Sequence, residues 1–151
     1  MSDEPVLDSV QPGDDPAIAS VINAVRAADG DAEAGFDHAW TADETTKWRE
    51  GIEAGGGGVV VARFAGSVVG FGTLEPVGPS VGSLGVWVTP SQRRRGLGTD
   101  LARGVLDLAR EKGFKRVRGK MLQGEAALSF LGSIGALVPM VNPEMEFELP
   151  L

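Results

Sequence analysis

The sequence predicts one α/β domain in which a single mixed, mostly antiparallel sheet is flanked by helices. Three observations lead to this fold class. The chain has 151 residues, which is about the length of one domain. Apolar residues at helical spacing alternate along it with β-branched runs, and two of these runs are joined by a turn short enough for an antiparallel pair. Because no repeat or low-complexity segment divides the chain, residues 1–151 are predicted to form one domain.

The N-terminal part predicts a short strand followed by a helix. Residues 6–10 form a short apolar segment. Asp15 is a good N-cap and Pro16 suits the first helical position, so a helix is expected to begin there and to end near Gly30. Its apolar face has helical spacing and consists of Ile18, Val21, Ile22 and Val25.

A second helix is expected before the strands of the sheet. Thr41 and Glu44 have the spacing of a capping box, which marks a helix start. The four glycines at 55–58 propagate a helix poorly, so the helix should end there and the glycines should form a connection rather than a phosphate loop.

Three strands are expected next. Residues 59–64 and 68–74 are β-branched and apolar, and the Ala-Gly-Ser stretch at 65–67 predicts a hairpin between them. A third strand over 84–89 should end at Pro90, because proline lacks the N–H that a central ladder needs.

The second half predicts helix, strand, helix and a last hairpin. A helix ending at Gly113 is marked by apolar residues three and four apart: Leu97, Leu101, Val105 and Leu108. A strand is expected at 116–121. Another helix, ending at Gly135, would bury Ala127, Leu131 and Ile134. Residues 137–140 and 145–149 should form the final hairpin around an Asn-Pro turn.

Charge is distributed unevenly along the chain, whose formal net charge is -7. Residues 1–57 carry 13 acidic and 3 basic side chains, a net charge of -10, and residues 121–151 carry 4 acidic ones. Residues 90–120 carry 10 basic and 3 acidic side chains, a net charge of +7. The basic stretch indicates either an anionic ligand held at one place or a solvated helix face. The acidic total argues against general nucleic-acid binding.

Other features exclude several classes of site and location. Residues 1–4 are acidic and polar, unlike the start of a secretory signal, and no apolar run approaches the roughly 20 residues that span a bilayer. A cytoplasmic protein without a membrane partner is expected. The absence of cysteine excludes disulfides, thiolate metal sites and a cysteine nucleophile, and no metal is expected.

The segment with the clearest chemistry is residues 86–99, where a strand, a turn, two glycines and a helix follow one another. A helix N-terminus offers unpaired N–H groups and a partial positive charge, which phosphate oxygens satisfy. Gly96 and Gly98 keep side chains away from those N–H groups. Positive charge is added by Arg93, Arg94 and Arg95. The pattern predicts a pyrophosphate site.

Two common phosphate motifs do not fit this segment. Leu101 stands where the dinucleotide fingerprint needs its third glycine, and the Gly-Lys-Ser/Thr of a Walker loop is missing. The segment resembles instead the coenzyme A loop of the GNAT acyltransferase superfamily: Gln or Arg, any two residues, Gly, any residue, Gly or Ala. Residues 93–98 fit every position, and the Val-x-Val-x-Pro at 86–90 is similar to the strand that leads into that loop. The order of elements resembles the GNAT fold over almost the whole chain.

The resemblance implies that acetyl-CoA or coenzyme A binds along this segment. Backbone N–H groups of residues 94–99 would bind the pyrophosphate, and the main chain of Val86 and Val88 would bind the pantetheine arm where two parallel strands splay apart. The side chain of Trp87 alternates to the other face, where packing is its expected role. The implied coenzyme site comprises Val86, Trp87, Val88, Arg93, Arg94, Arg95, Gly96, Leu97, Gly98 and Thr99.

The chain departs from the family pattern at the general acid. Many GNAT members carry an Asn, then a Tyr that protonates the departing thiolate, then a Gly-Phe pair. Aligned on Gly135, these positions hold Gly124, Leu131 and Ala136, and the chain contains no tyrosine. General acid catalysis contributes about 10²- to 10⁴-fold, yet a thiol with a pKa of about 8.5 leaves tolerably without it. The sequence therefore predicts weakened rather than forbidden activity.

Few residues are candidates for the general base. Glu75, at the end of the predicted strand 68–74, lies near where the resemblance implies that the acceptor approaches, and it is the catalytic candidate; a merely solvated carboxylate is the alternative. His38, the one histidine, has a suitable pKa but lies in a polar loop beside Asp37.

The resemblance implies an acyltransferase that moves an acetyl group from acetyl-CoA to an amine of a small molecule or protein, by direct attack in a ternary complex. The acidic segments favour a cationic acceptor, or they serve only solubility. One alternative is a coenzyme-A-binding module that has lost most catalysis and acts in sensing or subunit pairing. Another is a structural domain whose basic loop contacts a protein or RNA. The sequence is compatible with a homodimer.

Overall fold

One sheet organises the computed structural model, which describes residues 5–93, 96–120 and 146–150. Six described strands lie in the order β1-β2-β3-β4-β5-β6, and every neighbouring pair is antiparallel except β4–β5. The strands are β1 Val6–Ser9, β2 Gly58–Phe64, β3 Ser67–Gly78, β4 Val81–Val88, β5 Arg116–Lys120 and β6 Glu146–Pro150. The α-helices are α1 Asp15–Asp29, α2 Asp31–Ala34, α3 Ala42–Ala54 and α4 Leu97–Glu111, with short 3-10 turns at Pro12–Asp14 and Pro90–Gln92. The predicted fold class is confirmed.

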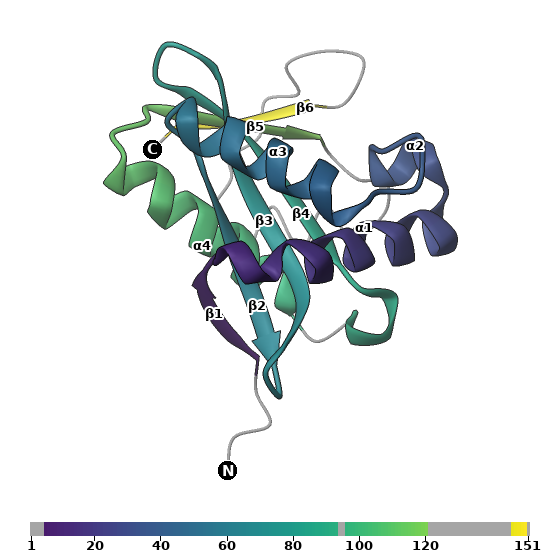
Figure 1. Ribbon diagram of the computed structural model, residues 1–151. Coiled ribbons are helices and arrows are strands. Elements are labelled where there is room, and N and C mark those ends of the chain that lie inside the picture. The colour runs from purple at the N-terminus through teal and green to yellow at the C-terminus, as the bar shows by residue number, and fades with distance from the viewer. Residues whose placement is uncertain (1–4, 94–95, 121–145, 151) are drawn as a thin grey trace.

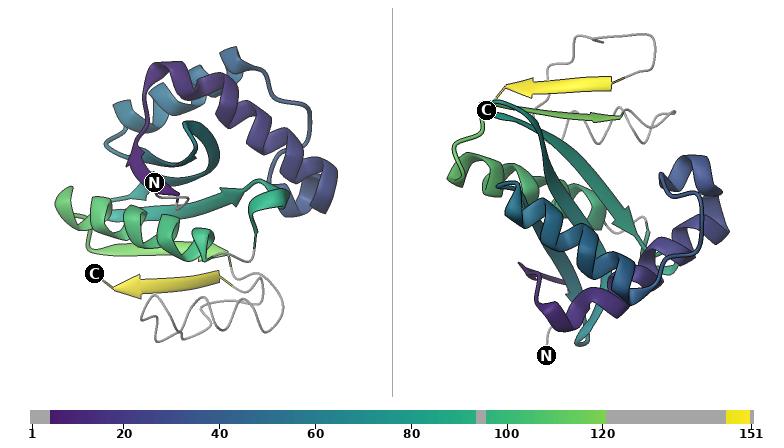
Figure 2. Two further views of the ribbon diagram at one scale, coloured as in Figure 1. Left: turned by 90° about the horizontal axis from the view of Figure 1, so that it is seen from below. Right: turned by 45° about the horizontal axis from the view of Figure 1, so that its top comes forward.

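Helices cover both faces of the sheet (Figures 1 and 2). α1 and α3 pack on one face, where Val61 and Phe71 belong to their apolar cluster. α4 packs on the other face, against Leu74 and Leu84. Successive strand residues point to opposite faces, so β3 contributes Phe71 to one core and Leu74 to the other. None of the described helices is long and apolar enough to cross a membrane.

The start of α1 differs from the prediction in its chemistry. Asp14 occupies the N-cap position and Asp15 is the first helical residue, but neither side chain caps the helix. The Asp14 carboxylate accepts two hydrogen bonds from Arg63, both 2.7 Å long. Asp15 forms an ion pair with Arg49 of α3. The prediction of Asp15 as N-cap is therefore wrong, because ion pairs with residues distant in sequence take up both carboxylates.

The second helix follows the prediction closely. Thr41 Oγ1 accepts the Glu44 N–H at 3.2 Å, and Glu44 Oε1 accepts the Thr41 N–H at 3.2 Å, which confirms the capping box. α3 ends at Ala54 and β2 begins at Gly58, so the glycines form the predicted connection.

The predicted hairpin between β2 and β3 is confirmed. Ala65 and Gly66 have φ angles of 51° and 84°, and two successive positive φ values are typical of the two-residue turns that match the twist of paired strands. β3 and β4 are both longer than predicted, because Glu75 pairs with Ser83 beyond the expected strand ends. Long-range pairing overrides the weak β propensity of that stretch.

The C-terminal prediction is only partly covered by the structure. β5 and β6 lie within one residue of the expected strands at 116–121 and 145–149. The helix expected around 127–134 and the strand expected at 137–140 lie outside the described residues.

Gly57 is required by a close approach of two backbones. A Cβ built there would lie 1.9 Å from the carbonyl oxygen of Leu74. Gly51, in contrast, is an exposed residue of α3 where a Cβ meets nothing within 4 Å.

This contrast gives a matched pair of stability variants. We expect Gly57→Ala to lower the free energy of unfolding by about 2 kcal/mol or more, since the backbone must shift to admit the methyl group. Gly51→Ala should raise it by about 0.5–1 kcal/mol, because alanine loses less entropy in a helix. Urea denaturation of both variants measures the difference, and equal stabilities would contradict the assigned contact.

Candidate functional site

β4 and β5 stay paired over only three residues. Within the described strands, the β4 residues Val81, Gly82 and Ser83 lie opposite Arg116, Val117 and Arg118 of β5. Beyond that point β4 continues to Val88 and β5 to Lys120 without further register, and the two strands diverge (Figure 2). The second half of β4 therefore has no strand partner on the β5 side among the described residues.

Val86 and Val88 turn their backbone groups toward this open edge. Thr89 donates its N–H to the carbonyl of Val69 in β3 at 2.9 Å. In an antiparallel ladder, successive residues alternate between bonding to the neighbour and facing away. Trp87 therefore shares the orientation of Thr89 toward β3, and Val86 and Val88 direct their N–H and C=O groups to the side of β5.

The start of α4 adjoins the open edge. Asp100 donates the first helical N–H bond, to the carbonyl of Gly96 at 3.0 Å, so the N–H groups of residues 97–99 precede the helical ladder. A Cβ built on Gly98 would lie 3.9 Å from Val86 Cγ1. The first turn of α4 therefore lies next to the side chain of Val86, in the open half of β4.

The two glycines at the start of α4 are needed for different reasons. Gly96 has a φ of 75°, and a Cβ there would meet nothing within 4 Å, so its role is conformational. Gly98 has ordinary helical geometry, and it leaves space in front of the N–H groups. The side chain of Leu97 is buried with Leu101 of the same helix and Ala62 of β2, and Thr99 is half-buried. Arg94 and Arg95 lie outside the described residues.

Arg93 is engaged with the protein itself. Its guanidinium donates two hydrogen bonds to the Asp29 carboxylate, at 2.8 and 2.6 Å, and its Nε donates to the Val88 carbonyl at 3.3 Å. Hydrogen bonding from Arg93 holds the pKa of Asp29 below its usual range. The loop before α4 is therefore tied to the end of α1, and one of the three predicted loop charges is neutralised.

Trp87 packs, as the alternation of the strand predicts. Its indole stacks on Phe71 with 4.9 Å between ring centroids, and its Nε1 donates to the carbonyl of Ala34 at 2.7 Å. It also contacts Phe36 and Trp48, at 5.5 and 5.9 Å. The side chain therefore links β4 to α2 and α3 on the face opposite α4.

Glu75 lies away from the open edge. It is exposed on β3 and pairs with Ser83, at the end of β4 that is still joined to β5. Val86 lies three positions after Ser83, which is about 10 Å along a strand. The structure does not bring Glu75 together with Val86 and Val88.

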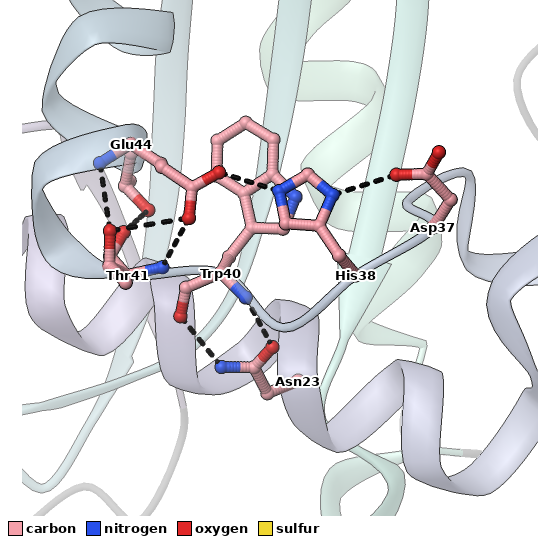
Figure 3. A network of polar contacts seen from close by, with 7 residues as sticks. Asn23, Asp37, His38, Trp40, Thr41 and Glu44 are labelled. Carbon is pink, nitrogen blue, oxygen red and sulfur yellow. Dashed lines mark hydrogen bonds and ion pairs between the residues drawn. The ribbon is translucent and has the colours of Figure 1, made fainter.

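A pocket of about 630 Å³ opens beside this aromatic face, formed by α2, α3 and the loop that joins them. His38 lies at its rim between two carboxylates (Figure 3). Its Nδ1 is 2.7 Å from Asp37 Oδ1 and its Nε2 is 2.6 Å from Glu44 Oε2. Hydrogen bonding to Glu44, and then to Asp37, raises the pKa of His38. Both ring nitrogens are engaged, so His38 in this position is not arranged to take a proton from an acceptor.

Asn23 fixes the loop that carries the pocket. Its side-chain amide donates to the carbonyl of Trp40 and accepts the N–H of the same residue, both at 2.9 Å (Figure 3). The indole of Trp40 stacks on His38, with ring centroids 5.8 Å apart and planes 18° apart. The loop is thus held to α1 by its backbone and to α3 by its side chains.

The raised pKa of His38 is directly measurable, because the chain has one histidine. In a proton NMR titration we expect a midpoint above the ordinary value of about 6.5. Because the folded-state pKa is the higher one, the paired imidazolium stabilises the fold below that ordinary pKa, and its contribution is lost as the pH rises through the folded pKa. Glu44→Gln should lower the midpoint more than Asp43→Asn does. A midpoint at or below the ordinary value would contradict the pairing.

Comparison with protein families decides the family. The model of the acetyltransferase (GNAT) family matches residues 24–135. The chain belongs to the GNAT acetyltransferase family. The match includes the open half of β4 and all of α4, so the family resemblance of the sequence is confirmed. No curated protein gives a significant match to the chain.

Solved structures show the same GNAT fold. The structure of yncA from Salmonella typhimurium, which contains its cofactor acetyl-CoA, has a TM-score of 0.82 and 21% identity, over 97% of this chain and 94% of that one. A ribosomal-protein-alanine N-acetyltransferase from Brucella melitensis has a TM-score of 0.80 and 21% identity, over 97% and 99%. A phosphinothricin acetyltransferase from Sinorhizobium meliloti, in complex with acetyl-CoA, has a TM-score of 0.79 and 16% identity, over 97% and 88%. At identities this low, the structural likeness establishes a shared fold and nothing more.

Several structural features of this GNAT chain could not be predicted from its sequence. The Arg93–Asp29 pair joins residues 64 positions apart in the sequence, and no local pattern predicts it. The aromatic pocket draws Phe36, Trp40 and Trp48 from a loop and a helix with no common period. The one available signal was composition, since two of the three tryptophans lie within nine residues of each other in the acidic part of the chain.

Proposed function

We propose that this protein is an acetyl-CoA-dependent N-acetyltransferase that acts on an amine of a small molecule or protein. The observation that carries the proposal is the contiguity of the α4 donor end with the open edge of β4, which Gly98 and Val86 bring together. The acetyl-CoA held by two proteins of the same fold supports it.

The coenzyme would lie along this surface from α4 to β4. N–H groups of residues 97–99 would bind the pyrophosphate, since a helix N-terminus combines free donors with a partial positive charge. The backbone of Val86 and Val88 would pair with the pantetheine arm like an additional strand. Val88 would then share its carbonyl with Arg93, whose Nε already donates to it. The remaining members of the site, Arg94 and Arg95, would add charge at the pyrophosphate.

The reaction requires few special side chains. The neutral amine nitrogen attacks the thioester carbonyl carbon, a C–N bond forms and the C–S bond breaks, and the sulfur departs with the bonding electrons. The amide nitrogen loses one proton and the thiolate gains one, so the products are an amide and the free thiol. A backbone N–H of β4 directed at the developing oxyanion would stabilise it.

Proton transfer would depend on water. The chain has no tyrosine to protonate the thiolate. Glu75 is the proposed proton acceptor, and it would act through water because its strand partner Ser83 lies about 10 Å from Val86. This arrangement predicts slow turnover compared with an enzyme that has a positioned acid, by up to about 10²- to 10⁴-fold.

A second function is favoured by one observation, the missing tyrosine. A coenzyme-A-binding module with weak or no catalysis would keep the α4 and β4 surface and lose only turnover. A cytoplasmic location and a homodimer stay predictions under either function.

One experiment separates these functions. Purified protein is titrated with acetyl-CoA by calorimetry and then incubated with acetyl-CoA and a panel of primary amines while free thiol is measured. Saturable binding with amine-dependent thiol release supports the transferase. Binding without release across the panel supports the module, and no binding at millimolar acetyl-CoA contradicts both.

A further inference from the structure

The pocket beside α2 has a mixed aromatic and acidic lining. Its wall combines aromatic rings with carboxylates, from Asp31, Phe36, Asp37, His38, Trp40 and Trp48. The rings are held in fixed positions, because Phe36 contacts Trp40 and Trp48 edge-on at 4.9 and 5.5 Å. The pocket is therefore a rigid aromatic surface open to solvent at an acidic rim.

Aromatic faces attract cations. A cation within about 6 Å of a tryptophan ring is attracted by the negative face of the ring, most strongly where water is excluded. His38 already stacks on Trp40, and its hydrogen bonds to Glu44 and Asp37 raise the pKa of the imidazole, which favours the cationic form. The surroundings of the pocket therefore favour positive charge over neutrality.

Among the described side chains at the rim, carboxylates outnumber cationic groups. Asp31 is paired with Arg26, while Asp37 and Glu44 share the single charge of His38. One negative charge is left over when His38 is protonated, and two when it is neutral. The side chains of Asp31 and Asp37 are 48% and 94% exposed, so they are accessible to a ligand. The rim complements a cation and repels an anion.

The group bound here cannot be the amine that reacts. The attacking amine must be neutral, whereas this pocket stabilises the protonated form. The proposed acetyl transfer takes place at the open edge of β4, and Trp87 connects that strand to the pocket through its contacts with Phe36 and Trp48. An acceptor that reaches both places must carry a primary amine at one end and a cation at the other.

We propose that the pocket of Phe36, Trp40 and Trp48, with its rim of Asp31 and Asp37, binds a second, non-reacting ammonium group of the acceptor, so that the preferred acceptor is an alkyl diamine. This proposal rests on the proposed acetyl transfer, and it names the class of acceptor for that reaction.

Three acceptors of equal length test the proposal: 1,6-diaminohexane, 6-amino-1-hexanol and 6-aminohexanoate. Each offers one type of primary amine, and the far end is cationic, neutral or anionic. After correction for its two equivalent amines, the diamine should have a kcat/KM about tenfold above that of the amino alcohol, mostly through KM. The amino acid should be the poorest acceptor.

Two variants locate the effect. Trp40→Leu removes an aromatic face and should abolish the preference for the diamine over the amino alcohol. Asp37→Asn changes a 94% exposed side chain, so it should fold normally and should reduce the preference about twofold to threefold. Glu50→Gln, on the exposed surface of α3, is the charge-matched control and should leave the preference unchanged. A preference that survives both pocket variants would overturn the proposal.

A binding measurement separates this proposal from the transferase itself. Tetramethylammonium chloride should change the tryptophan fluorescence saturably, and sodium chloride at equal ionic strength should not. Equal transfer to all three acceptors would overturn the diamine proposal and support the transferase. Saturable cation binding without transfer to any acceptor would overturn the transferase and with it the diamine acceptor, and it would support only the cation-binding pocket. The absence of both binding and transfer would overturn the pocket and the transferase together.

Discussion

Gly98→Glu should weaken acetyl-CoA binding at least about 100-fold and leave the fold intact. The new carboxylate would stand in front of the α4 N–H groups, accept their hydrogen bonds and repel the pyrophosphate. Loss of two charge-assisted hydrogen bonds, each about 1.5–3 kcal/mol, is enough for this effect. The helix should remain stable, because Gly98 has ordinary helical geometry and a Cβ built there would lie 3.9 Å from Val86 Cγ1, an ordinary contact. A glutamate in the first turn is also favourable to the helix dipole. Calorimetry with acetyl-CoA measures the affinity.

Gly51→Glu is the matched control for this variant. It makes the same substitution at an exposed helical glycine of α3, where a Cβ meets nothing within 4 Å. We expect its affinity for acetyl-CoA to stay within about twofold of the parent, since surface charges distant from a site are largely screened. Unchanged affinity in Gly98→Glu, with a normal thermal melt, would show that the coenzyme does not bind at the start of α4. Gly96 is less suitable for this test, because its φ of 75° would strain any other residue.

Arg49→Met should lower the free energy of unfolding by about 3–5 kcal/mol, the usual cost of removing one partner of a buried ion pair. Arg49 and Asp15 are 7% and 3% exposed, and Asp15 Oδ1 and Oδ2 accept from the guanidinium at 2.7 and 2.9 Å. Thr46 adds a third hydrogen bond to Asp15, at 2.7 Å. The variant leaves the Asp15 carboxylate buried without its cation. Urea denaturation at neutral pH measures the loss.

The pH dependence of this loss identifies its cause. Burial opposes ionisation of Asp15, but hydrogen bonds from Arg49 and Thr46 outweigh it and hold the pKa of Asp15 below its usual range. In the parent, this contribution is present above the ordinary pKa of about 3.9 and is lost as the pH falls through the lower folded value. In Arg49→Met, burial should instead raise the pKa of Asp15, so acidification should narrow the stability difference from the parent.

Two controls accompany the ion-pair variant. Asp15→Asn combined with Arg49→Met removes the buried charge and should recover part of the lost stability. Asp107→Asn breaks an exposed pair with Arg110, whose partners are 73% and 54% exposed, and should cost less than about 1 kcal/mol. A loss in Arg49→Met no larger than in Asp107→Asn would show that the buried pair is not what joins α1 to α3.

The ion pairs also explain how α1 is held to α3 and to the loop before α4. Asp15 and Arg49 join the start of α1 to α3, and Asp29 and Arg93 join the end of α1 to the loop before α4. α1 is therefore fixed at both ends by acidic residues, one buried and one about one-third exposed. The large negative charge of residues 1–57 is thus partly structural. From the sequence, this charge was expected either to favour a cationic acceptor or to serve only solubility.

Local features of the fold were predictable because neighbouring residues decide them. The Thr41–Glu44 capping box and the Ala65–Gly66 turn need only residues a few positions apart, so the sequence identifies both. The loop before α4 is local in the same sense, since a strand end, two glycines and a helix start follow within 13 residues of each other. The family, the loop that leads into α4 and most strand positions were therefore predictable from the chain alone.

The tertiary structure decided what depends on residues distant in the chain. The sequence favours Asp15 as a helix cap, and only the approach of Arg49 from α3 makes it half of a buried ion pair. From the sequence, Arg93 is expected to be a free charge that binds phosphate, but in the structure the end of α1 places Asp29 beside it. The aromatic pocket exists only where the α2–α3 loop folds over Trp87. In a local motif, backbone geometry over a few residues determines which side chains are neighbours. The partner of a charge or an aromatic ring is instead the side chain that the packing of helices on the sheet brings near. No short stretch of sequence determines that partner.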